Sequence, residues 1–132
     1  VDKTFRWALY DREPLPCWSN RRLTLLGDAA HPMLPHLGQG ANQAIEDGMA
    51  LAVMLASADA KDYPAVLLAY EKLRRERVAD IQMGARKHGL RVDSLSGDLA
   101  KRDAELVAHA EFRKQLYSYD VAPVARAAVG GR

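Results

Sequence analysis

One cysteine, little net charge and no long hydrophobic run characterise this sequence of 132 residues. Because Cys17 is the sole cysteine, we expect a free thiol, with no internal disulfide and no cysteine cluster for a metal ion. No apolar run approaches the roughly 18 residues that a membrane-spanning helix needs, and the opening VDKTFRWALY has no apolar signal region. We therefore expect a cytoplasmic protein of a reducing compartment that neither crosses nor binds a membrane.

The charges are nearly balanced, with 19 Lys and Arg against 17 Asp and Glu. Since the basic residues are spread along the chain, nucleic-acid binding is not expected. The mixed-charge run EKLRRER at 71–77 predicts the solvated face of a helix. A hydrophobic content of 48% is typical of one soluble globular domain. His31 and His36 have no third ligand nearby, so no metal site is expected.

Two segments read as strands. Phe5, Trp7 and Leu9 alternate with more polar residues over 4–9, which is the period of a half-buried strand. The apolar run RLTLL at 22–26 predicts a buried strand that stops at Gly27-Asp28. The proline-containing segment between them predicts a loop.

Three helices are expected after these strands. Ile45, Met49, Ala52 and Leu55 recur at helical spacing and predict an inward face for a helix over 42–58. An Asp cap near Asp62, followed by a proline, predicts the start of a second helix, and apolar residues at helical spacing predict a length of about 25 residues. Its apolar line is Leu67, Tyr70, Leu73, Val78, Ile81 and Ala85, ending near 88–89. A third helix is expected over 99–116, and the tail 117–132 reads as a turn and a poorly ordered end. The fold class is mainly α with one or two strands.

The segment between the second strand and the first helix carries the strongest functional signal. Gly27 permits close approach at the strand end, and Asp28 places a carboxylate there, which suits hydroxyl groups rather than phosphates. Prolines stiffen the following loop, and Gly38 and Gly40 let the backbone present N–H groups at the helix start. These features favour a polyol joined to a flat group that becomes anionic. The alternative for Asp28 alone is an ordinary turn residue.

The motif RLTLLGDAAHPMLPHLGQGANQAIEDGMALA resembles the second flavin-binding motif of the FAD-dependent aromatic hydroxylases, the single-component flavoprotein monooxygenases. The GDAAH followed by P-x-x-GQG-x-N-x-x-x-ED is a long and specific match. Together with LYDREPLPCW it is most similar to salicylate hydroxylase and its relatives that act on hydroxybenzoates or hydroxynicotinate. The resemblance is strong over 20–58 and weaker elsewhere, including LYSYD near the end.

The resemblance implies roles for the matching positions. Asp28 would bind the ribityl hydroxyls of FAD, and Gly27 would make room beside the cofactor. Pro35 would place its carbonyl near the reactive edge of the isoalloxazine ring, and His36 would lie beside the substrate cavity, so these two are the catalytic candidates. The pyrimidine end of the ring would be lined by Gly38, Gln39, Gly40, Ala41 and Asn42.

The chain lacks the GxGxxG and middle DG motifs of this family, so it resembles the last third of such an enzyme. We expect 1–20 to be the end of the substrate-domain sheet and its loop, 21–58 the second FAD-binding motif, and 59–132 a C-terminal helical region. The fold would be the C-terminal part of an α/β, Rossmann-like FAD-binding fold. Alone, the fragment is expected to be inactive and to associate with itself or with the missing N-terminal part.

The whole enzyme would use NAD(P)H and O₂ to hydroxylate a salicylate-like aromatic acid. One alternative is another hydroxylase of the same fold, acting on hydroxynicotinate or 3-hydroxybenzoate. The other is a non-catalytic helical interaction module that retains the motif. A stable, stoichiometric complex formed without flavin would distinguish this module from the enzyme.

Overall fold

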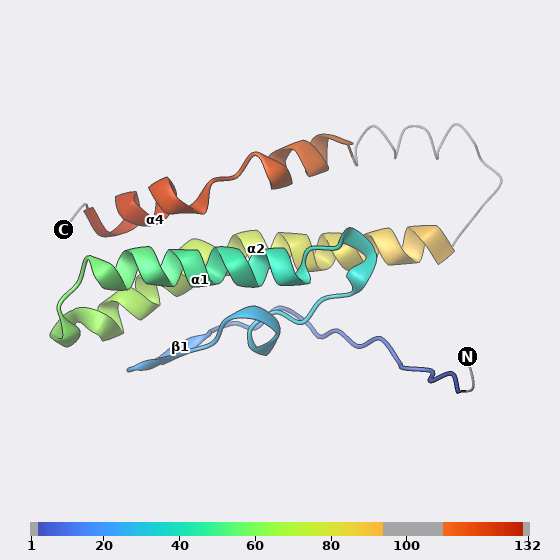
Figure 1. Cartoon of the computed structure of the whole chain (residues 1–132), viewed down its shortest axis with the longest axis horizontal. Helices are drawn as coiled ribbons and strands as arrows, with labels where there is room; N and C mark the ends of the chain where they lie inside the picture. Colours follow the sequence, from blue (N-terminus) through green and yellow to red (C-terminus); the bar gives the residue numbers. More distant parts are fainter. Residues whose placement is uncertain (1–2, 94–109, 131–132) are drawn as a thin grey trace.

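The computed structural model describes residues 3–93 and 110–130 of the chain. Two long helices, α1 (Gly40–Ala56) and α2 (Tyr63–Asp93), run antiparallel along the centre (Figure 1). Helix α4 (Val121–Gly130) and a helical segment at 110–117 cover one side of this pair, and the N-terminal segment with a small hairpin covers the other. The predicted fold class, mainly α with short strands, is confirmed.

The hairpin pairs β1 (Ser19–Asn20) with β2 (Leu23–Thr24) in antiparallel register. The strand predicted for RLTLL is therefore only two residues long, and it is not buried, since Leu23 is 61% exposed. The strand predicted over 4–9 is not formed, because a strand needs a neighbouring strand for its backbone groups and the described chain offers none there. Trp7 in this segment is 82% exposed.

Helix α1 confirms the helix predicted at 42–58, shifted by two residues, but of the predicted inward face only Leu55 packs against the core. Ile45 is 70% exposed and Met49 is 47% exposed. The buried positions of α1 are instead Gln43, Asp47, Ala50 and Met54. This face turns inward because Asp47 finds charged and polar partners there, as described below.

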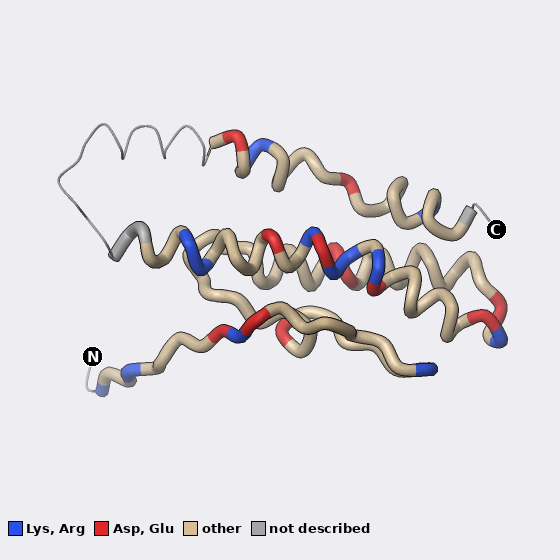
Figure 2. Tube along the Cα trace, turned by 180° about the vertical axis from the view of Figure 1, so that it is seen from behind, with Lys and Arg blue, Asp and Glu red and all other residues tan. Residues whose placement is uncertain are grey.

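Helix α2 confirms the long second helix, and its predicted apolar line lies in the core except for the half-buried Leu73. Figure 2 shows charged residues gathered along this helix. The prediction that run 71–77 is a solvated face is wrong for Arg74, which is 0% exposed, and for Glu71, which is also buried, whereas Lys72 and Glu76 are exposed.

The tail does not end as predicted. Instead of a turn and a poorly ordered end, residues 121–130 form α4, which buries Val121 and Ala125 in the core. The predicted third helix lies mostly outside the described residues, and its end at 110–117 is helical. The remaining buried core includes Trp18, Ala30, Met54, Val66, Tyr70 and Val78. No helix in the described part is long and apolar enough to cross a membrane.

Candidate functional site

A short, tightly turned loop connects β2 to α1. Gly27 has φ +55 and begins the 3-10 turn η1 (Gly27–Ala29). A Cβ at Gly27 would lie 3.2 Å from the Cβ of Ala44, so the loop packs directly on α1. A second 3-10 turn, η2 (Pro35–Leu37), ends at Gly38 with φ +62. Both positive φ values favour glycine, as the sequence indicated.

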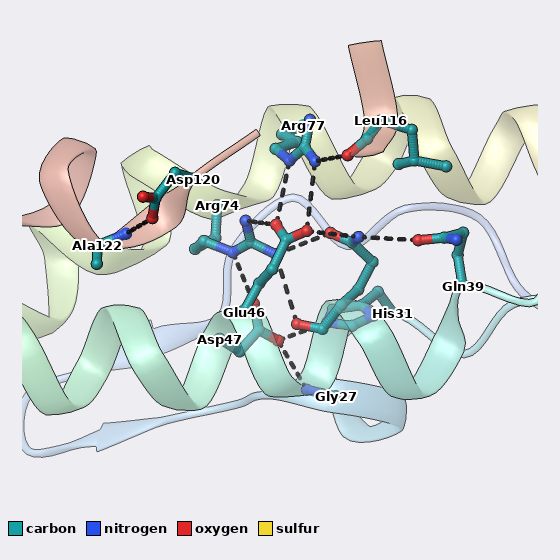
Figure 3. A network of polar contacts seen from close by, with 11 residues as sticks. Gly27, His31, Gln39, Glu46, Asp47, Arg74, Arg77, Leu116, Asp120 and Ala122 are labelled. Carbon is teal, nitrogen blue, oxygen red and sulfur yellow. Dashed lines mark hydrogen bonds and ion pairs between the residues drawn. The ribbon is translucent and has the colours of Figure 1, made fainter. Parts of the chain in front are cut away.

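The carboxylate of Asp47 anchors this loop from inside the molecule. Its Oδ2 accepts a hydrogen bond from the backbone N–H of Gly27 at 3.0 Å and lies 2.6 Å from Nε2 of His31 (Figure 3). Asp47 and His31 are both buried. The structure therefore assigns His31 to holding the loop.

Arg74 of α2 neutralises the same carboxylate. Its Nε donates to Oδ1 of Asp47 at 2.8 Å, and its Nη1 donates to Oε2 of Glu46 at 2.6 Å. Its Nη2 donates to Oε1 of Gln43 at 2.9 Å. A buried guanidinium is tolerated because carboxylates and amide oxygens take up its donors. The network thus joins the loop, α1 and α2 at one point.

The ionisation of this network follows from its contacts. Burial by itself raises the pKa of Asp47, but the hydrogen bonds from His31, Gly27 and Arg74 outweigh burial and leave it below 3.8. Burial likewise opposes the charge on Arg74, but Asp47 and Glu46 keep its pKa above the ordinary value. The carboxylate and the guanidinium are therefore both charged at neutral pH.

Arg77 extends the network to the C-terminal part of the chain. Its guanidinium contacts both carboxylate oxygens of Glu46, at 3.2 and 3.3 Å, and donates to the Leu116 carbonyl at 3.2 Å. The same group lies 3.7 Å from the ring centroid of Tyr119, in cation–π geometry. Glu46 therefore connects the loop helix with residues 116–119.

On the outer side of the loop, most of the predicted cofactor-binding residues are exposed, and Gly27 and Gln39 are the buried ones. Asp28 is exposed, and its Oδ1 lies 3.9 Å from the position of a Cβ on Gly40. The first intrahelical bond of α1 runs from the N–H of Gln43 to the carbonyl of Gln39. The N–H groups of Gly40, Ala41 and Asn42 precede it and have no intrahelical acceptor.

The structure thus brings Gly27, Asp28 and Gly40 together, with Gly38, Gln39, Ala41 and Asn42 at the same helix start. Gln39 is buried, and its amide lies 3.5 Å from the Leu37 carbonyl, whereas Asn42 is exposed. Pro35 and His36 lie further along on η2, and the His36 ring packs against Gly89 of α2.

Sequence reasoning missed the network of Glu46, Asp47 and Arg74. The sequence places Glu46 and Asp47 in the flavin-binding motif and Arg74 in the run predicted to be a solvated face. The ED pair within the motif was a signal that two adjacent acids needed partners, but nothing local identified Arg74 as that partner. In the described part of the chain, no group of three His, Cys, Asp or Glu could hold a metal ion.

Comparisons with known proteins point to one enzyme family. A family model described as an FAD binding domain matches residues 11–85. The chain is 43% identical over 127 residues to a 3-amino-4-hydroxybenzoate 2-monooxygenase of Streptomyces platensis, covering 94% of this chain and 32% of that protein. It is 49% identical over 77 residues to a 6-hydroxynicotinate 3-monooxygenase of Pseudomonas fluorescens, covering 58% of this chain and 20% of that protein.

Among solved structures, a salicylate hydroxylase substrate complex matches with a TM-score of 0.81 and 39% identity. The match covers 93% of this chain and 31% of that structure. This chain therefore spans about a third or less of the length of the curated relatives it matches.

Proposed function

This chain belongs to the family of FAD-dependent aromatic hydroxylases, and we propose that the whole protein binds FAD and hydroxylates an aromatic acid. The observation that carries the proposal is the exposed Asp28 carboxylate beside Gly40 at the start of α1. The proposal concerns the whole protein, because this chain spans a minor share of its relatives.

The residues at this loop fit FAD, and the surroundings of Gly40 indicate this. A Cβ added there would make only ordinary van der Waals contacts, at 3.9 Å from Asp28 and from Met33. The described chain therefore has no steric need for glycine at this position. A glycine that the fold does not require, next to an exposed carboxylate and free helix N–H groups, suits close approach of a ligand.

Each residue at this loop has a chemical task in the proposal. Asp28 would accept hydrogen bonds from the ribityl hydroxyls of FAD, with Gly27 leaving room beside it. The N–H groups at residues 40–42 would stabilise negative charge on the ring system through the helix start. Gly38 and Gln39 would line the same end of the ring. When bound, FAD supplies the redox chemistry by which NAD(P)H and O₂ hydroxylate an aromatic ring.

Pro35 and His36 would face the reacting groups. The proline carbonyl would orient the reactive edge of the ring system and help to exclude water from it. The imidazole of His36 can donate or accept a hydrogen bond with a phenol or a carboxylate, which suits an aromatic acid. We propose a salicylate-like hydroxybenzoate as substrate, with 3-hydroxybenzoate or 6-hydroxynicotinate as the alternatives within the family. A cytoplasmic location is part of the same proposal.

In this reading, residues 1–20 contribute to the substrate-domain sheet, 21–58 form the second FAD-binding motif, and 59–132 form a helical region that supports it. The support is physical, since Arg74 of α2 neutralises the Asp47 carboxylate that holds Gly27.

Gly40→Ala tests the proposal in the whole protein. The added methyl fits the chain but enters the proposed FAD space, so we expect at least about tenfold weaker FAD binding with the melting temperature unchanged or slightly higher. Asp28→Ala should weaken FAD binding to a similar degree, through loss of hydrogen bonds to a charged acceptor. The measurement is FAD titration followed by visible absorbance.

Gly48→Ala is the matched control, because Gly48 lies in the same helix with open space around it and away from the loop. It should leave FAD binding unchanged. If the unaltered whole protein takes up no flavin even with added FAD, the hydroxylase proposal fails, and the motif serves as scaffold in a helical interaction module.

A further inference from the structure

Helix α2 contains two glycines where it passes the loop. Gly84 and Gly89 lie in the interior of a 31-residue helix, where glycine is an unfavourable residue. A Cβ at Gly84 would lie 3.2 Å from Cζ of Phe112 and 3.5 Å from Cδ1 of Leu37 in η2, and Gly89 lies under His36 of η2. The helix therefore gives up intrinsic stability at positions that receive the loop.

The contact at Gly89 is the closer one. A Cβ built on Gly89 would overlap Cδ2 and Nε2 of the His36 ring and would lie 3.1 Å from its Cγ. Gly89 is buried, and the His36 ring is half-buried. The ring thus occupies the place that any other residue at position 89 would fill.

The loop is also held to α2 upstream of this point. Nε2 of Gln82 donates to the Pro32 carbonyl at 2.9 Å and to the Arg12 carbonyl at 2.8 Å. Because Pro32 is held by Gln82 and His36 by Gly89, the segment between them has little freedom to shift along α2. Packing on Gly89 then decides in which direction the imidazole points.

We propose that Gly89 is a positioning residue, which directs the His36 imidazole toward the aromatic acid by leaving room for the ring on α2. The inference rests on the proposed function, since it takes His36 to meet the carboxylate or the phenol of the substrate. A methyl at position 89 displaces the ring rather than the helix, because a side chain rotates more readily than a helix backbone moves.

Gly89→Ala in the whole protein tests this, with Gly84→Ala as the matched control. Gly84→Ala makes the same chemical change in the same helix, but its methyl meets Phe112 at 3.2 Å and Leu37, and not His36. The dissociation constants of salicylate, 3-hydroxybenzoate and 6-hydroxynicotinate are measured from the perturbation of flavin absorbance. For the acid that binds most tightly, Gly89→Ala should raise the dissociation constant about tenfold with FAD content unchanged.

Gly84→Ala should change the same constant less than twofold. An unchanged constant in FAD-loaded Gly89→Ala protein would overturn the proposal. A double-mutant cycle adds a readout that a merely structural role would not give. In the His36→Ala background, Gly89→Ala should have no further effect on the dissociation constant. Gly89→Ala alone should lower the melting temperature because its methyl overlaps the His36 ring, and the double variant should not show this loss. Equal losses in both backgrounds would show that Gly89 acts elsewhere, against the proposal.

A readout independent of flavin separates this inference from the proposed function. The ring resonances of His36, assigned by comparison with His36→Ala, should shift in Gly89→Ala and stay in place in Gly84→Ala. Resonances that do not move would overturn the positioning role. If the unaltered protein holds no FAD, the proposed function fails. The His36 resonances still decide whether Gly89 determines the orientation of the His36 ring.

Discussion

At Asp47, one buried carboxylate takes hydrogen bonds from a backbone amide, an imidazole and a guanidinium. Each of these partners belongs to a different part of the chain: the turn, the loop and α2. Removing one partner leaves the others buried and unsatisfied, and this penalty exceeds the net gain from an intact buried ion pair.

Arg74→Gln is expected to lower the free energy of unfolding by about 3 to 5 kcal/mol, because it leaves the Asp47 charge buried without its cation. The matched control is Arg75→Gln. Arg75 is its neighbour on α2 but is partly exposed, and its ion pair with Glu71 spans 3.5 Å, so the expected loss is at most about 1 kcal/mol. Urea unfolding of the three proteins measures the difference. Equal losses would mean that the Arg74 network contributes little.

The pH dependence of stability should carry the signature of Asp47. Its hydrogen bonds lower its pKa in the folded protein from the ordinary value of 3.8, so its contribution is present above the unfolded pKa and is lost as the pH falls through the folded value. Asp47→Asn removes this contribution. The gap in free energy of unfolding between the unaltered protein and Asp47→Asn should therefore narrow below pH 3.8, as measured by urea unfolding from pH 7 to pH 3.

Asp28→Asn serves as the control for acid stability, because the Asp28 carboxylate is exposed. Its free energy of unfolding at pH 7 should differ little from that of the unaltered protein. A gap for Asp47→Asn that is independent of pH would contradict the assignment of Asp47 as the charged centre of the network.

At the scale of elements, α1 and α4 are the two helices whose packing differs from expectation. Helix α1 buries Asp47 and Gln43 and exposes Ile45, because its polar side chains find partners on α2. Helix α4 forms where a frayed tail was expected, because Val121 and Ala125 lie against the core of the molecule. In both helices, packing against a distant segment outweighs the local pattern.

Ala125→Asp is expected to lower the free energy of unfolding by more than about 2 kcal/mol, because the carboxylate would be buried between α4 and the core without a partner. Ala127→Asp, two residues along the same helix, is the control. Ala127 is exposed, so its substitution should change stability by about 0.5 kcal/mol or less. Thermal unfolding distinguishes them, and similar melting temperatures for both variants would argue against the docking of α4.

At the scale of the whole molecule, apolar surface remains open on the N-terminal segment and on the outer face of α1. Phe5, Trp7, Leu9, Tyr10, Ile45 and Met49 are all exposed in this chain. Exposed apolar patches of this kind mark surfaces that other protein covers. We therefore propose that the chain associates with itself or with a further part of the protein.

The chain produced by itself should show a mass above 14.6 kDa by light scattering at micromolar concentrations. Trp7→Ser combined with Tyr10→Ser should raise the dissociation constant about tenfold or more, because two large apolar side chains no longer contribute to burial. A single species of 14.6 kDa at all concentrations would contradict the proposed association.

The sequence by itself determined the local features of this protein: the two main helices, the glycine positions at Gly27 and Gly38, and the flavin-binding motif. These depend on helical periodicity and on backbone φ, which act over a few residues. The tertiary structure alone decided which face of α1 is buried, that Arg74 is an interior charge, that α4 forms, and that His36 rests on Gly89. Those outcomes depend on partners remote in the chain, such as Asp47 and Arg74 at a separation of 27 residues, which no local pattern encodes.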